Sequence, residues 1–337
     1  MYNSPPMIFR SVLLVCLSLF ATAVFAAPLP AAAQDDIDLE ATQRVLPSVG
    51  AGVVAVRRDA ARRYYVLSER GGAVQVFDEK GKPLAPIPTA PSKDATIIYG
   101  VDLDVDSLGR VCVADRGADA IKIFSPDGHF ERRISISGPT AVLALPNGEI
   151  AVSSLRSPKL VTVFNAQGHV AREFGEPADV AERAELNRYV NIGRLARDLA
   201  GHVYYSFTYL PEPTLRRYDR FGYSDLTIAL NTLDFLSVAQ ATRREIAQQE
   251  RGGTPSLKPV VGAVGVDPQS GEMWLAIGGR LLRFAPDGTE RGSYLIFTKD
   301  GHRIEASAIL PEPGRLLVAS PLLGIFEIPR PGSAVKK

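Results

Sequence analysis

The sequence predicts an all-β protein, a six-bladed β-propeller with four-stranded antiparallel blades and short helical insertions. Three observations lead to this fold. A strand that ends in an aromatic residue and a glycine turn recurs along the chain, two further strands precede each copy, and the copies follow one another at about forty residues. A single four-stranded sheet cannot cover both of its faces, whereas several copies packed around one axis can.

Each repeat reads strand, turn, strand, loop, strand, turn, strand, and we call these strands a to d. Apolar residues alternate along them, as at Val111 and Val113, so each strand buries one face. The a and b strands are expected within 53–69, 101–115, 141–154, 193–206, 264–277 and 307–320. The c strands with their turns are expected at 74–81, 121–128, 161–168, 215–222, 281–288 and 324–332.

The two ends of the repeat region predict how the ring closes. The sixth copy ends after its c strand, at Ile328, and therefore lacks a d strand. The segment TQRVLPS (42–48) precedes the first a strand and has no other place in the repeat pattern. We predict that it pairs with the c strand of the sixth blade, so that deletion of residues 27–48 destabilises the domain.

The first residues have the order of a secretory signal. Arg10 precedes the apolar run 11–26, and small residues follow it. We expect a signal peptide at 1–26, a linker at 27–41 and the propeller at 42–332, with cleavage after Ala26 or Ala33. Export to the periplasm or the extracellular space would follow, with no membrane span after cleavage; the alternative is an uncleaved membrane anchor.

The second repeat carries a family resemblance. Its sequence GVDLDVDSLGRVCVADRGADAIKIFSPDG (100–128) resembles an NHL repeat, whose pattern runs close to Gly-Ile-Ala-Val-Asp, then Gly-x-Ile-Tyr-Val-Ala-Asp, then a strand that ends in Val-Phe. The third and fifth repeats are recognisable and the others have diverged. The resemblance implies a six-bladed propeller that serves as a binding platform or, less often, as an enzyme.

The predicted topology separates two faces. The b–c loops and the d–a connections emerge on one face, and the short a–b and c–d turns on the other. The three long insertions, 88–97, 178–190 and 231–253, all follow d strands and are expected on the first face. In the last of them, Leu233, Leu236, Ala239 and Ile246 have helical spacing. This helix either packs on the propeller or serves as a lid or docking element.

Basic residues recur in the loops of the same face. Arg70, Arg116 and Arg156 occupy matching places in three successive b–c loops, and Lys159 and Arg280 lie in equivalent loops. Neighbouring guanidinium groups could hold a carboxylate or phosphate. The alternative is that these arginines are solvated or paired locally, since acidic residues precede two of them.

The channel offers a second candidate site. Asp102 and Asp104 share one face of an a strand, and Arg194 and Glu305 begin two others. A mixed polar lining is one interpretation and a divalent cation with oxygen ligands is the other. The gluconolactonase-type propellers use acidic and amide ligands from several blades, and matching positions here carry Ala144, Ala196 and Gly265. The histidines each follow a turn glycine and are not expected to converge on a metal.

These observations favour an exported scaffold that binds a protein or a cell-envelope component through its loop insertions, acts as a monomer and needs no cofactor. The formal net charge of +1 provides no electrostatic footprint for nucleic acid. The alternative function is a metal-dependent lyase or hydrolase, similar to gluconolactonase, with a divalent cation near Asp102 and Asp104.

Overall fold

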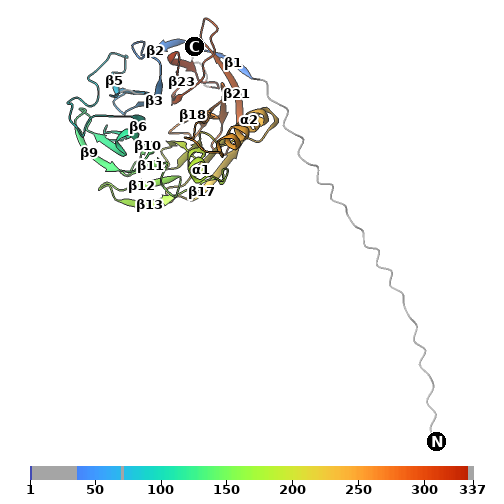
Figure 1. The fold of residues 1–337 in the computed structure, drawn as a ribbon. Coiled ribbons are helices and arrows are strands. Elements are labelled where there is room, and N and C mark those ends of the chain that lie inside the picture. Colours follow the sequence, from blue (N-terminus) through green and yellow to red (C-terminus); the bar gives the residue numbers. More distant parts are fainter. Residues whose placement is uncertain (2–35, 70–71, 333–337) are drawn as a thin grey trace. The chain divides into compact units, whose positions relative to one another are not determined.

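The chain folds into six β-sheets arranged around one axis, which is the predicted β-propeller (Figure 1). The computed structural model describes Met1 and residues 36–69 and 72–332. Apart from Met1, the expected signal peptide lies outside these residues. Each complete blade runs from an inner a strand to an outer d strand in antiparallel order, and Figure 1 shows β6 and β10 inside β9 and β13.

Consecutive strands of the chain form each of the first three blades. The first blade contains β3 (Val53–Arg58), β4 (Tyr64–Ser68) and β5 (Gln75–Phe77). The second contains β6 (Gly100–Val105), β7 (Val111–Asp115), β8 (Ala120–Phe124) and β9 (Phe130–Ser135), with the 3₁₀ helix η1 (Arg116–Ala118) between β7 and β8. The third contains β10 (Pro139–Ala144), β11 (Ile150–Ser154), β12 (Val161–Phe164) and β13 (Val170–Phe174).

The remaining blades follow the same order. The fourth contains β14 (Gly193–Arg197), β15 (Val203–Phe207), β16 (Thr214–Tyr218) and β17 (Ser224–Ala229). The fifth contains β18 (Val261–Val266), β19 (Met273–Ile277), β20 (Arg280–Phe284) and β21 (Glu290–Phe297). The sixth contains β22 (Ala308–Glu312), β23 (Arg315–Ser320), β24 (Gly324–Pro329) and, from the other end of the domain, β2 (Gln43–Val45).

The ring is closed by its a strands and by the chain termini of the domain. Each a strand contacts the a strand of the next blade, and β22 returns to contact β3. Strand β2 pairs antiparallel with β24, with Arg44 opposite Phe326. The prediction that 42–48 supplies the missing strand beside the sixth c strand is therefore confirmed. Because this strand joins residues far apart in sequence, it ties the first blade to the last.

Two blades depart from the four-stranded pattern. Residues 37–40, which we expected to belong to a linker, form β1 (Ile37–Glu40), and β1 pairs parallel with β21 as a fifth strand of the fifth blade. The first blade has three strands, and its outer edge is completed by the isolated bridges Val74–Ile87 and Phe77–Pro83. The parallel pairing of β1 has no counterpart in the repeat, so the repeat pattern could not predict it.

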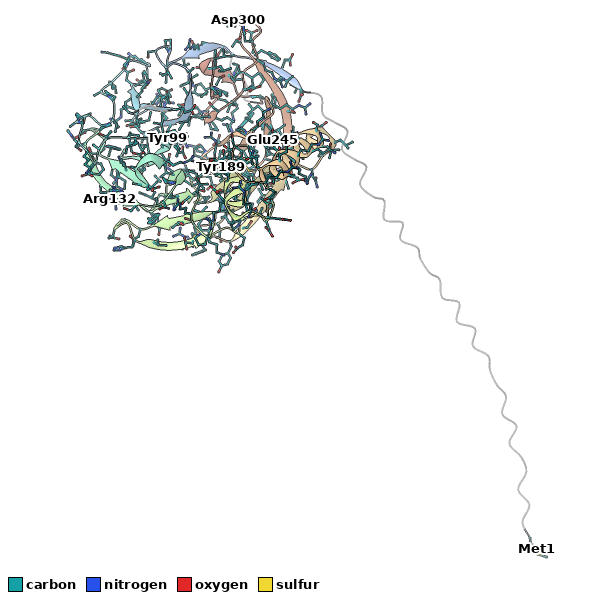
Figure 2. The ribbon with its side chains drawn as sticks, in the orientation of Figure 1. Met1, Tyr99, Arg132, Tyr189, Glu245 and Asp300 are labelled. Carbon is teal, nitrogen blue, oxygen red and sulfur yellow. The ribbon has the colours of Figure 1, made fainter. Side chains whose placement is uncertain are left out.

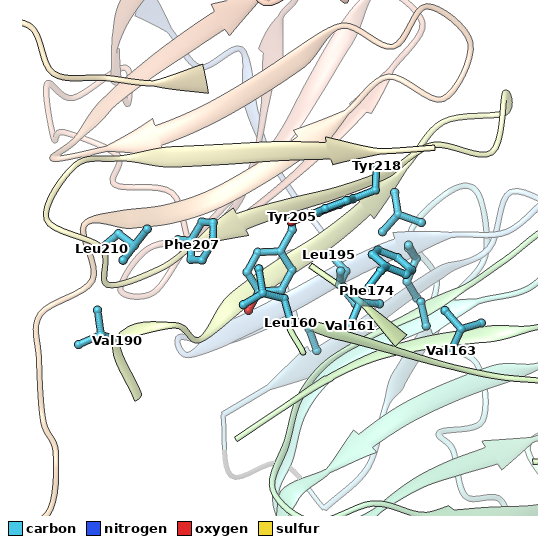
Figure 3. Packing of buried hydrophobic residues seen from close by; sticks show 14 of the residues in the cluster. Leu160, Val161, Val163, Phe174, Val190, Leu195, Tyr205, Phe207, Leu210 and Tyr218 are labelled. Atoms are coloured by element: carbon cyan, nitrogen blue, oxygen red, sulfur yellow. The ribbon is translucent and has the colours of Figure 1, made fainter. Parts of the chain in front are cut away.

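Apolar side chains fill the space between successive blades. Between the third and fourth blades, Val161, Phe174, Leu195, Tyr205 and Tyr218 belong to one buried cluster (Figure 3). The rings of Phe174 and Tyr218 lie 5.0 Å apart between centroids. Such contacts explain why the blades need each other: each sheet buries its faces only against its neighbours.

The expected helix in the third insertion is present as α2 (Leu233–Gln249), but its buried side differs in part from the prediction. Phe235, Ala239, Thr242 and Ile246 are buried, whereas Leu233 is 87% exposed and Leu236 is 45% exposed. The helix therefore packs on the propeller through Ala239 and Ile246, as predicted, whereas Phe235 and Thr242 take the places expected for Leu233 and Leu236. A second helix, α1 (Ala184–Val190), occupies the 178–190 insertion. Within the described residues, no helix is long and apolar enough to cross a membrane.

Candidate functional site

The b–c loops and the d–a connections meet on one face of the propeller, which we call the insertion face. Backbone hydrogen bonds join them directly: the amide of Arg116 donates to the carbonyl of Tyr99 over 2.9 Å, and the amide of Thr208 donates to that of Ile192 over 2.8 Å. The opposite face carries the a–b and c–d turns, and we call it the turn face. The long insertions thus stand among the loops that were expected to carry the site.

The second and third insertions form one layer. Both carboxylate oxygens of Glu250, just after α2, accept backbone N–H groups of the other insertion: Glu182 N lies 2.7 Å from Oε1 and Arg183 N lies 3.0 Å from Oε2. Ile246 of α2 shares a buried cluster with Leu186 of α1. The two insertions are therefore fixed to each other and to the third and fourth blades, as a rigid platform rather than as two separate loops.

The first insertion is fastened to the second blade by a buried ion pair. The carboxylate of Asp115 accepts the amides of Ile98, at 3.0 Å, and Tyr99, at 2.8 Å. The ammonium group of Lys122 lies 3.0 Å from the same carboxylate and also donates to the carbonyl of Thr96. Burial alone would raise the pKa of Asp115, but these hydrogen bonds and Lys122 outweigh burial and hold that pKa below its ordinary value.

The structure partly answers the question of the three arginines. Arg70 lies outside the described residues. Arg116 begins η1, its Nε donates to the carbonyl of Pro139 in the third blade, at 3.2 Å, and its guanidinium lies 5.9 Å from the ring centre of Tyr99. Arg156 is exposed. Neither Arg116 nor Arg156 forms an ion pair within the described part of the chain, and Asp115, which precedes Arg116, pairs with Lys122 instead.

The other two basic residues have acidic partners. Lys159 pairs with Glu176, which follows the d strand of the same blade. The Nε of Arg280 lies 3.0 Å from Asp36, just before β1. Their charges are partly neutralised, so they contribute less to the potential of the insertion face than Arg116 and Arg156 do.

The channel aspartates surround an arginine from the first blade. Arg57, at the end of β3, lies 3.3 Å from Asp102 through Nη2 and 3.3 Å from Asp104 through Nε. The second oxygen of each carboxylate accepts a backbone amide of β10, that of Val142 at 3.1 Å for Asp102 and that of Ala144 at 2.9 Å for Asp104. This donor set does not fit a divalent cation, because a cationic side chain and amide hydrogens already occupy the carboxylate oxygens.

The remaining channel residues do not add ligands. Burial raises the pKa of Asp102, and Arg57 and the amide of Val142 oppose that shift. Arg194 donates to the carbonyl of Val54 at 3.3 Å, and burial lowers its pKa. Glu305 is exposed at the entrance to the sixth blade. In the parts that the structure describes, no group of three or more His, Cys, Asp and Glu residues is placed to hold a metal ion.

Tyrosines at the channel mouth are part of the site that we did not predict. The rings of Tyr189 and Tyr209 stack with centroids 4.9 Å apart, and Figure 2 shows Tyr99 and Tyr189 near the middle of the ring. Burial raises the pKa of Tyr209, and the charges of Arg194 and Arg116 oppose it, so both arginines act on the same phenol. Tyr99 and Tyr189 each precede the a strand of a blade, and Tyr209 follows the b strand of the fourth blade. These positions in the repeat could have indicated from the sequence that the tyrosines lie on the insertion face.

The four histidines do not converge. His129, His169 and His202 each follow the glycine of a tight turn on the turn face, in three different blades, and His302 lies in a turn after β21. His202 contacts Asp198 at 2.7 Å, and His302 contacts Asp300 at 3.1 Å. Their separation around the ring agrees with the distribution that we expected.

No family model matches this sequence, and no curated protein matches it either. Solved structures do resemble it. A streptogramin B lyase structure aligns over 83% of this chain and 93% of its own, with 13% identity and a TM-score of 0.55. The virginiamycin B lyase from Staphylococcus aureus aligns over 86% and 87%, with 12% identity and a TM-score of 0.52. The WD40 repeats of RRP9 align over 87% and 99%, with 9% identity and a TM-score of 0.55.

The likeness is one of fold. At such low identity the neighbours show a propeller and do not transfer an activity, and they include both lyases and a WD40 domain. Membership of the NHL-repeat family stays a prediction, because no family model matches the sequence. The propeller fold itself is common to scaffolds and binding proteins, and the function must be argued from the insertion face.

Proposed function

We propose that this chain is an exported binding scaffold that holds a protein or a cell-envelope ligand against its insertion face. The observation that carries the proposal is the asymmetry of the two faces. One face has only short turns, whereas the other combines a rigid layer of two insertions, fixed through Glu250, with loops that present Arg116 and Arg156. Rigid blades that display loops on one side suit recognition, because little conformational entropy is lost on binding.

The chemistry of the insertion face supports a macromolecular ligand. Arg116 lies against Tyr99, and Tyr189 stacks on Tyr209, so arginines and half-buried aromatic rings lie near one another at the channel mouth. These are the residue types enriched where protein interfaces gain most of their binding energy. Leu233 and Leu236 add exposed apolar surface at the start of α2, within the third insertion.

Site-specific photo-crosslinking tests the proposal. A photoreactive amino acid is placed at Arg156, exposed on the insertion face, and, as a matched control, at Arg220, exposed on the turn face. We expect a discrete crosslinked product in source cells from position 156 and none from position 220. Products of equal yield from both positions, or no product from position 156, would contradict the proposal.

Export is a separate part of the proposal and has its own test. The charged, apolar and small-residue order of the N-terminal region supports it. N-terminal sequencing of protein purified from the source is expected to begin at Ala27 or Gln34. A mature protein that begins at Met1 would rule out cleavage at either site and favour the uncleaved membrane anchor, without affecting the binding face. We propose a monomer, which light scattering of the purified protein tests.

The alternative, a lyase or hydrolase with a cation in the channel, has weaker support. Some structural neighbours are lyases by name, which makes the question worth testing. The aspartates that would hold the cation are instead occupied by Arg57 and backbone amides. We therefore place the function on the insertion face rather than in the channel.

A further inference from the structure

A small pocket of about 230 Å³ opens on the insertion face between the third blade and the second insertion. Its floor includes Thr140 of β10 and Ser153 of β11, and one side is the b–c loop that carries Ser157 and Lys159. The other side is formed by α1 and the residues after it, including Arg188. The pocket thus exists only because the insertion lies against a neighbouring blade loop.

Thr140 is the most informative residue of this pocket. The residue is only 8% exposed, and its hydroxyl oxygen has no hydrogen-bond partner within the described residues. A buried hydroxyl without a partner is destabilising, and proteins rarely keep one without a reason. A ligand group that accepts its proton inside the pocket would remove that cost.

The neighbouring hydroxyls already donate their protons within the protein. The single phenol proton of Tyr205 is donated to the carbonyl of Asn191 at 2.6 Å, so Ser153, at 3.2 Å from the same phenol, donates to it. Thr162 donates its single hydroxyl proton to the carboxylate of Glu173 at 2.8 Å, so Ser157, at 3.2 Å from the Thr162 oxygen, donates to that oxygen. Of these hydroxyls, only that of Thr140 therefore keeps its proton for a ligand.

The charge of the pocket has one sign. Lys159 and Arg188 line it, and none of the described residues that line it is Asp or Glu. Glu176 neutralises part of the charge of Lys159 from outside, whereas Arg188 forms no ion pair within the described residues. Leu155 and Ile192 supply apolar wall beside these groups. One free hydroxyl donor, two cations and an apolar wall fit a small organic anion.

We propose that this pocket binds a small organic oxyanion, a carboxylate or phosphate monoester with a short apolar body. The oxyanion accepts a hydrogen bond from Thr140 and faces Lys159 and Arg188, while its body contacts Leu155 and Ile192. This anion site differs from the proposed docking surface for a macromolecule, because it consists only of the pocket between the third blade and the second insertion.

Calorimetry or ligand-observed NMR on the full chain tests this with three probes that share one apolar body: butyl phosphate, butyrate and butylamine. We expect saturable binding of butyl phosphate or butyrate and none of butylamine, and the stronger of the two anions identifies the head group. Absence of anion binding, or equal binding of butylamine, would overturn the proposal.

Variants assign the binding to this pocket. Thr140→Val keeps the shape and removes the hydroxyl, and Arg188→Gln removes the exposed charge; each is expected to weaken anion binding about tenfold or more, the size typical for a hydrogen bond to a charged group. Thr140→Ser, which keeps the hydroxyl, binds like the wild type. Arg220→Gln on the turn face is the charge-matched control. Unchanged affinity in the first two variants, with folding verified by circular dichroism, would contradict the assignment.

The outcome is separable from the macromolecular function. Loss of anion binding in Thr140→Val with crosslinking from position 156 intact supports two independent uses of the insertion face. Anion binding without any crosslinked product retains the pocket and removes the docking proposal.

Discussion

The ammonium group of Lys122 lies 3.0 Å from the carboxylate of Asp115, and both side chains are almost completely buried. This pair joins the b and c strands of the second blade to the first insertion, because Asp115 also accepts the amides of Ile98 and Tyr99. A buried charge left without its partner is costly, so the two residues are not equivalent in mutagenesis.

Asp115→Ala is expected to destabilise the domain by about 3 to 5 kcal/mol, because it leaves the Lys122 charge buried and two amides unpaired. Lys122→Met is expected to cost less, since Asp115 keeps its backbone donors. Urea unfolding followed by fluorescence measures both. Equal effects of the two substitutions would contradict the arrangement.

The same pair predicts a pH dependence. Since the folded-state pKa of Asp115 is below its ordinary value of 3.8, its contribution to stability is complete above that pH and is lost as pH falls through the folded value. Lys122→Met should bring the folded-state pKa of Asp115 closer to its unfolded-state pKa. The variant should therefore lose less stability in acid than the wild type does. Unfolding curves between neutral and strongly acidic pH test the difference. A steeper acid loss in Lys122→Met than in the wild type would refute it.

Ring closure by β2 predicts a strong effect of N-terminal truncation. Deletion of residues 27–48 removes β1, β2 and the buried Leu46, and burial of one such leucine alone is worth about 2 to 5 kcal/mol. We expect a large fall in melting temperature. The control deletes residues 27–35, before β1, and should melt like the full chain. A shorter chain that is equally stable would show that the ring does not need this strand.

The contact between the insertions predicts local rather than global changes. Glu250→Ala removes the acceptor of the Glu182 and Arg183 amides, and each lost hydrogen bond to a charged group is worth about 1.5 to 3 kcal/mol. Hydrogen exchange at these two amides should accelerate by at least about tenfold, while exchange in β10 stays unchanged. Gln248→Ala, at an exposed position of α2, is the control. Unchanged exchange at both amides would show that Glu250 does not hold the layer together.

The arrangement of charges in the channel predicts that divalent cations do not change the stability of the protein. Because Arg57 lies between Asp102 and Asp104, neither calcium chloride nor a chelator should shift the melting temperature of the wild type. An upward shift with calcium that disappears in Asp104→Asn would favour the lyase or hydrolase alternative instead.

Cys112 is buried in β7, and burial raises the pKa of its thiol. In a Cys16→Ser chain it is the only thiol, and it should react with Ellman's reagent only after unfolding in concentrated guanidinium chloride. Rapid reaction of the folded protein would indicate that the second blade opens easily. Ala114 lies on the same strand, and Ala114→Cys, equally buried, provides a comparison.

The repeat explains why so much of the fold could be predicted. Alternation of apolar residues, as at Val111 and Val113, fixes which side of each strand is buried, and a missing d strand at Ile328 indicates the closing partner. For the apolar stripe of α2 the prediction was confirmed at Ala239 and Ile246 and wrong at Leu233 and Leu236, which are exposed. Helical spacing places a stripe within about one turn, and only the surface beneath the helix selects the side.

The candidate site was harder to predict, because the partners in an ion pair can lie far apart in the sequence. Asp115 precedes Arg116 in sequence yet pairs with Lys122. Arg280 pairs with Asp36, which lies near the other end of the domain in sequence. Asp102 and Asp104 look like cation ligands along one strand until Arg57 of the neighbouring blade is placed between them. The spacing of residues along one strand does not predict ion-pair partners on another blade.

The sequence alone predicted the order of strands, the number of blades and the face that carries the insertions. These features depend on the repeat period, on the alternation of apolar residues and on turn residues, all of which act between near neighbours in the chain. Only the tertiary structure decided the parallel pairing of β1 and the hydrogen bonds at Glu250. The same holds for the Thr140 hydroxyl, which lacks a partner among residues 36–69 and 72–332. They depend on distances between residues of different blades, which the closing of the ring sets and no local pattern contains.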